Sequence, residues 1–163
     1  MAEKFYAKEN KPYPNHPLPI LYYPGAIMNL LEEHDPAQEV LSFLAKNGYT
    51  NGWVNGILPE HHFHSNTHEV LACIAGEAHV QLGGPDAEIY PFKKGDIVLL
   101  PAGTTHKRIK ASDRFRIVGA YPDGLEPDMQ KGDGDYEKIK KTVAEVAVPE
   151  TDPVDGKRIE EWE

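Results

Sequence analysis

The sequence predicts an all-β fold, a small antiparallel β-barrel with one or two peripheral helices. Glycine and proline are each present 14 times among 163 residues, which is typical of short strands joined by tight turns. Short β-rich runs alternate with turn signals between residues 51 and 121, at a spacing of roughly ten residues. One segment before these runs has a strong helix pattern.

The N-terminal part is expected to contribute little regular structure. Residues 1–19 are rich in proline and charge, and we expect an extended arm rather than a helix or strand. Residues 20–28 (ILYYPGAIM) form a candidate first strand, interrupted by Pro24 and Gly25.

The strongest helix pattern covers residues 36–47. Asp35 suits the N-cap, Pro36 suits the first helical position, and Gly48 suits the end. Apolar residues at helical spacing form one stripe, so we expect the helix to pack on the outside of a sheet.

The barrel domain is expected over residues 20–126, including this helix. Its β-rich runs are residues 53–58, 61–64, 69–76, 78–92, 96–103 and 107–122. Gly83-Gly84-Pro85-Asp86 predicts a hairpin turn. Residues 127–163 are expected to form an acidic C-terminal extension, packed on the barrel or mobile, with a short helix near 135–146.

Composition excludes several classes of protein. The formal net charge is −9, so a nucleic-acid partner is not expected. No apolar run approaches the roughly 20 residues that span a bilayer, and the first residues lack the apolar core of a secretory signal. Cys73 is the single cysteine, so an internal disulfide is impossible. We therefore expect a cytoplasmic protein without a membrane partner.

Four side chains suggest a metal centre. His62 and His64 are two residues apart and share a face if the segment is a strand. Glu69 follows after a polar stretch, and His106 follows a Pro101-x-Gly103 turn. Three imidazoles and one carboxylate suit one divalent transition metal: Fe, Mn, Ni, Zn, Co or Cu.

The arrangement of these residues resembles the two motifs of the cupin family. The first motif is matched by Gly56, five residues, His62-Phe63-His64, four residues, Glu69, six residues and Gly76. The second is matched by Gly95, five residues, Pro101-Ala102-Gly103, two residues and His106. Lys110 replaces the final asparagine of the second motif, which leaves the ligand set intact.

Further stretches narrow the resemblance to the bacterial YjlB-type cupins. They are HHFHSNTHEVL (61–71), QLGGP (81–85), LPAGTTHKR (100–108), VGAYP (118–122) and TDPVDG (151–156). The resemblance implies a double-stranded β-helix closed into a conical barrel, a metal bound by His62, His64, Glu69 and His106, and a homodimer. It implies no particular reaction.

Three further residues are candidates for catalytic roles. His68 could hydrogen-bond Glu69 or a bound ligand, or be exposed to solvent. Strand alternation places His79 and Gln81 together, either facing solvent or a dimer partner, or facing the pocket. Arg108 lies two residues after His106, so it either faces the pocket and binds an anion or forms an ion pair at the barrel rim. Cys73 shares the parity of Glu69 and so could line the pocket, either as a small apolar residue, which is the usual role of a buried cysteine, or as a catalytic thiol.

Two functions remain open from the sequence. The first is a metal-dependent enzyme, with dioxygenase-type or isomerase/lyase chemistry, acting on a small organic molecule that is anionic if Arg108 faces the pocket. The alternative is a non-catalytic cupin that binds or senses a small molecule. Tight ligand retention without turnover would distinguish the second from the first.

Overall fold

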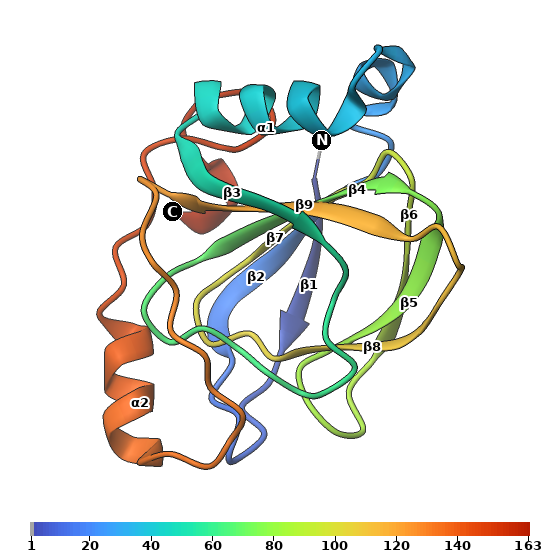
Figure 1. Cartoon of the computed structure of the whole chain (residues 1–163). Coiled ribbons are helices and arrows are strands. Elements are labelled where there is room, and N and C mark those ends of the chain that lie inside the picture. The colour runs from blue at the N-terminus through green and yellow to red at the C-terminus, as the bar shows by residue number, and fades with distance from the viewer. Residues whose placement is uncertain (1) are drawn as a thin grey trace.

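The computed structural model describes residues 2–163 and contains two antiparallel sheets that face each other (Figure 1). The larger sheet has six strands in the order β1-β2-β7-β4-β9-β3, and the smaller has three in the order β6-β5-β8. The strands are β1 (Glu3–Ala7), β2 (His16–Tyr23), β3 (Tyr49–Asn55), β4 (Glu69–Ala75), β5 (Glu77–Leu82), β6 (Ile89–Lys93), β7 (Ile97–Leu100), β8 (His106–Ala111) and β9 (Arg116–Pro122). The prediction of a mainly β fold is confirmed.

The predicted peripheral helix is also present. Helix α1 (Pro36–Lys46) begins after Asp35, whose carboxylate accepts a hydrogen bond from the backbone N–H of Gln38 at 3.3 Å. Val40 and Leu44 are buried and pack against the outer face of the six-stranded sheet. Asn47 caps the C-terminal end, and Gly48 follows with a φ of 93° that an L side chain would rarely adopt.

The central strands of the six-stranded sheet are buried on both faces, which explains why β4 and β7 are almost continuously apolar. We call the cluster between the two sheets the barrel core; it includes Leu71, Val80 and Ile117. The cluster on the other face, the outer core, packs α1 and the C-terminal Ile159 and Trp162 against this sheet.

The expected extended arm contains a strand instead. β1 pairs with β2, and β2 begins at His16, four residues before the expected start, and ends at Tyr23 before Pro24. Asn15 fastens the arm to the barrel because its side chain donates to the Gly83 carbonyl at 3.0 Å and accepts from the Thr105 N–H at 3.0 Å.

The C-terminal extension is ordered against the barrel. Helix α2 (Tyr136–Ala144) lies beside the barrel and starts after Asp135, which accepts from the backbone N–H of Lys138 (Figure 1). Beyond it, the Trp162 indole N–H donates to the Pro19 carbonyl at 2.8 Å. Short 3-10 turns occur at η1 (Met28–Glu32) and η2 (Glu160–Trp162). Within residues 2–163, no helix combines the length and apolar character needed to cross a membrane.

Candidate metal centre

The backbone places the candidate ligands at one end of the barrel core. Glu69 is the first residue of β4 and lies on the same face as Leu71, toward the interior. His106 is the first residue of β8 and pairs with Leu82, which also faces inward. The segment that carries His62 and His64 pairs with β8 through two hydrogen bonds between His62 and His106, of 3.2 and 2.9 Å.

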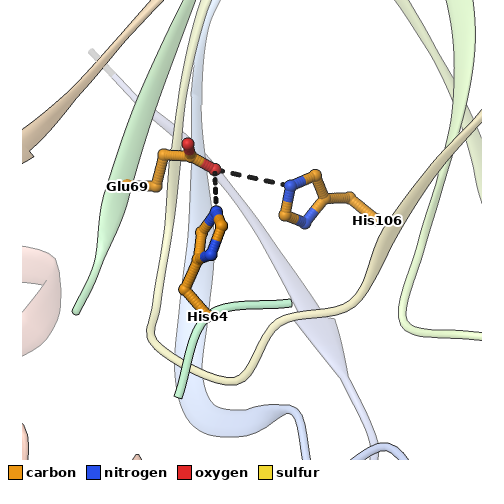
Figure 2. Close-up of side chains that lie close together, drawn as sticks. All are labelled: His64, Glu69 and His106. Atoms are coloured by element: carbon orange, nitrogen blue, oxygen red, sulfur yellow. Dashed lines mark ion pairs between the residues drawn. The ribbon is translucent and has the colours of Figure 1, made fainter. Parts of the chain in front are cut away.

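Three of the four predicted ligands converge on one point (Figure 2). The Nε2 atoms of His64 and His106 each lie 3.4 Å from Oε1 of Glu69. One ligand atom from each of these residues lies within 4.8 Å of the others, and all three side chains are buried. His62 is outside this group of three, but its ring centroid lies 4.1 Å from that of His106, and it lines the same cavity.

The backbone fixes which ring nitrogen of each histidine is free. The Nδ1 atoms of His62, His64 and His106 lie 2.8, 2.5 and 3.0 Å from the carbonyl oxygens of Glu60, Asp128 and Thr104. A carbonyl oxygen can only accept, so each Nδ1 carries the hydrogen and donates it. In the neutral rings, the Nε2 lone pairs are therefore available to a cation.

Electrostatics also suit a cation at this point. Burial opposes ionisation of Glu69, but His106 and His64 nevertheless hold its pKa well below the usual range. Burial lowers the pKa of His62 to about 3, so this imidazole is neutral at physiological pH. Glu69 Oε1 is buried without a hydrogen-bond partner, an arrangement that is costly unless another group satisfies it. The donor set is thus one carboxylate with three imidazoles, a combination that divalent transition metals accept.

A cavity of about 250 Å³ opens onto these side chains. Its walls are largely apolar, and Leu58 and Met129 are exposed at 39% and 50% along its lining. Trp53 and Tyr121 also line it, and the Trp53 indole N–H donates to the Tyr121 hydroxyl at 2.8 Å. Gly119 permits this arrangement because a Cβ at that position would lie 2.2 Å from Cζ2 of Trp53.

Asp128 was not among the residues that the sequence suggested. Its carbonyl accepts from His64, and its carboxylate accepts from the backbone N–H of Ser65 at 2.7 Å and from Gln130 at 3.0 Å. The segment is further fixed by paired backbone hydrogen bonds between Phe63 and Gln130. Asp128 lies in the extension that the sequence separated from the barrel, yet it holds His64, a candidate metal ligand.

The structure does not bring His68 to this cavity. Its Nδ1 accepts from the Ala102 N–H at 2.8 Å, so its Nε2 carries the hydrogen and donates to the Ala147 carbonyl at 3.1 Å. Its ring lies 4.9 Å from that of Trp162. Burial lowers its pKa to about 4, and both ring nitrogens are occupied. His68 therefore ties the turn before His106 to the C-terminal extension and has no free nitrogen for catalysis.

His79 is likewise outside the cavity. β5 points Ala78 and Val80 into the barrel core, which places His79 on the opposite face, across from Pro91 and Lys110. Gln81 shares this outer face, and its amide donates to the Ala87 carbonyl at 3.0 Å. Neither residue is in a position to contact a ligand in the cavity beside His64, Glu69 and His106, which we call the metal cavity.

Arg108 and Cys73 have different environments. Arg108 pairs with Val80, so the strand register places it on the inner face of β8, although its half-buried side chain does not line the cavity. Its role as an anion-binding residue stays a prediction. Cys73 is fully buried in the barrel core, and burial raises the pKa of its thiol to about 12. Cys73 is accordingly a packed apolar residue rather than a nucleophile.

The two facing sheets and the inward cluster of histidines and glutamate define the class of protein. The family model for the Cupin domain matches residues 53–117, which include all four predicted ligands. The chain is 36% identical over 159 residues to the YjlB protein of Bacillus subtilis (strain 168), covering 96% of this chain and 92% of that protein. The chain belongs to the cupin family and, within it, is a YjlB-type cupin.

Solved structures of other cupins are more distant. Acireductone dioxygenase from Bacillus anthracis is 17% identical, with a TM-score of 0.44, over 67% of this chain and 82% of that chain. The QdtA 3,4-ketoisomerase from Thermoanaerobacterium thermosaccharolyticum is 14% identical, with a TM-score of 0.44, over 56% and 70% of the respective chains.

Proposed function

We propose that this chain binds one divalent transition metal through His64, Glu69 and His106, with His62 as a fourth ligand, and acts on a small organic molecule as a metal-dependent enzyme. One observation carries the proposal. A buried carboxylate oxygen without a hydrogen-bond partner faces two Nε2 atoms whose tautomers are fixed by backbone carbonyls. Three lone-pair donors directed at one another repel unless a cation or a proton lies between them.

The side chains that line the cavity determine which molecule can reach His64, Glu69 and His106. A bound divalent ion supplies Lewis acidity, and a redox-active ion also supplies electron transfer. Apolar side chains such as Ile57, Leu71 and Ile117 line the cavity and favour an apolar group beside the donors. We therefore expect a substrate with oxygen atoms at one end and an apolar remainder.

Tyr121 is the protein group best placed to donate a hydrogen bond to such a substrate. Its oxygen accepts the Trp53 indole hydrogen, and its own hydrogen can be donated either to the nearby Glu69 carboxylate or to a bound molecule. Burial, followed by the charge of Glu69, raises its pKa, so the hydroxyl stays protonated at physiological pH. We propose that Tyr121 orients a substrate oxygen in the cavity.

Elemental analysis of freshly purified protein, followed by oxygen-uptake and product assays with candidate small acids, tests the proposal. Iron or copper with substrate-dependent oxygen uptake supports dioxygenase-type chemistry. Zinc or nickel with product formation and no oxygen uptake supports isomerase or lyase chemistry. A retained small molecule without turnover supports the alternative, a binding or sensing cupin. Failure to bind any of the six candidate metals contradicts the proposal as a whole.

Assembly, location and domain limits stay predictions. A cupin with an exposed edge strand is expected to pair as a homodimer, with help from the N-terminal arm. A monomeric mass by light scattering at micromolar concentration would contradict this. We also propose a cytoplasmic location. The predicted limit between arm (1–19) and barrel (20–126) falls inside β2 (His16–Tyr23), so we place the start of the barrel no later than His16 and keep 127–163 as the extension.

A further inference from the structure

A second cavity, of about 220 Å³, lies in the barrel core beside the metal cavity. Its inner walls come from both sheets and include Ile20, Val80, Leu82 and Val98, all of which are buried. Protein interiors are close-packed, and voids larger than a water molecule are few. An apolar cavity of about 150 Å³ in another protein stays dry and accepts benzene, so this cavity can hold an aromatic ring.

The rim of this cavity is aromatic. The rings of Phe5 and Tyr90 lie 4.6 Å apart, and Tyr22 stands 6.3 Å from Phe5. The Tyr22 hydroxyl donates to the buried carboxylate of Asp96, so it is already satisfied and is not available to a ligand. Apart from the Tyr90 hydroxyl at the rim and the Glu3 carboxylate, the side chains of the lining offer apolar contact to a ligand.

The charge at the rim of this second cavity disfavours an anionic ligand. Glu3 is the one charged residue among the described residues that line the cavity, and it is exposed at the edge strand β1. A carboxylate at the rim repels a fatty-acid or phosphate group, and no lysine or arginine lines the cavity to offset it. An uncharged ligand fits this lining best.

The two cavities share two wall residues. Ile57 and Leu71 line both, and Leu71 is two residues from Glu69 on the same face of β4. The second cavity therefore borders the metal cavity at these two aliphatic side chains.

We propose that this second cavity is a binding site for an uncharged apolar group of about the size of an aromatic ring. The group is either the apolar part of the substrate or a separate small molecule. Only the first of these sources depends on the proposed metal-dependent function, because the cavity walls do not include His64, Glu69 or His106.

Binding of fluorobenzene, followed by ¹⁹F NMR, tests the site in the full-length protein. Wild-type protein is expected to bind it saturably. Val80→Phe and Val98→Phe fill the cavity and are expected to weaken binding by about tenfold or more, since the added ring occupies the same space. Ile89→Phe is the matched control, because Ile89 is exposed on the outer face of β6 and should leave binding unchanged.

Circular dichroism and thermal unfolding establish that each filled variant is folded, and using two variants keeps the test valid if one is not. Absence of saturable binding in wild type would overturn the proposal. Equal binding by wild type and both folded variants would also overturn it.

Hydroxamates with the metal-loaded protein distinguish the two sources. If the substrate supplies the group, 4-phenylbutanohydroxamate should bind more tightly than acetohydroxamate, and Val80→Phe should abolish this difference. If the group belongs to a separate molecule, both hydroxamates should bind equally, and fluorobenzene should bind together with either. Metal content, measured on the same samples, shows independently whether the metal proposal has failed.

Discussion

The backbone carbonyl oxygen of Asp128 lies 2.5 Å from Nδ1 of His64, although 64 residues separate them in the chain. This contact fixes the tautomer of His64 and leaves Nε2 directed at Glu69. The C-terminal extension therefore completes the candidate metal centre.

Replacing Asp128 with alanine should weaken this support. The change removes the acceptor for the Ser65 N–H and for the Gln130 amide, while the carbonyl that contacts His64 remains. We expect a loss of about 1–3 kcal/mol in the free energy of unfolding and a metal affinity lower by about 10–100-fold. Urea denaturation and competitive chelator titration measure the two effects. Asp133→Ala, at an exposed position of the same extension, should change neither.

Protonation of His68 should destabilise the metal-free protein in acid. Its folded pKa is about 4, below the ordinary value of 6.5 that the unfolded chain restores. Between these values the unfolded state binds a proton that the folded state does not, so this contribution is complete above the unfolded pKa and is lost as pH falls toward 4.

The expected loss at the acidic end is on the order of 3 kcal/mol relative to a residue that does not titrate. Urea denaturation of wild type and His68→Gln at about pH 7 and about pH 4.5 measures it. The deficit of the variant relative to wild type should shrink at the lower pH. Parallel pH profiles for both proteins would refute this account of His68.

Arg108 should matter if the ligand is anionic. Arg108→Met is expected to weaken binding of malonate to the metal-loaded protein by about 1.5–3 kcal/mol, the contribution of a hydrogen bond to a charged group, with metal content unchanged. Isothermal titration calorimetry measures the malonate affinity, and elemental analysis measures the metal content. Lys107→Met is the matched control because Lys107 pairs with Gln81 on the outer face. Equal malonate affinity in wild type and Arg108→Met would favour a neutral ligand.

Local signals explain how much of the fold was predictable. Asp35 and Pro36 correctly marked the start of α1, and the glycine turn at 83–86 correctly predicted the β5–β6 hairpin. The sequence does not predict strand β1, because β1 is short, carries charge and precedes several prolines. Its only strand partner is β2, and this pairing is not visible in the local sequence pattern.

The sequence predicts the position of a site residue only where that residue belongs to a motif or to a regular strand. The motif spacing identified Glu69 and His106, which converge as expected. Parity would have excluded His68, since the residue beside an inward Glu69 must face outward. The register shift opposite Arg108, between His79 and Val80, is invisible in the sequence and places Lys110 across from His79 on the outer face. Asp128 carries no motif, and only the folded chain brings it to His64.

Metal titration of wild type and Glu69→Gln tests the central claim most directly. After removal of metal with a chelator, wild type should bind one equivalent of at least one of Fe, Mn, Co, Ni, Cu or Zn per chain. Glu69→Gln removes the charged donor while preserving its shape, and should lower affinity by at least about a hundredfold. Glu60→Gln, at an exposed acid near the cavity, should bind as wild type does. Undiminished metal binding by Glu69→Gln, or none by wild type, would contradict the assignment of this cluster as a metal centre.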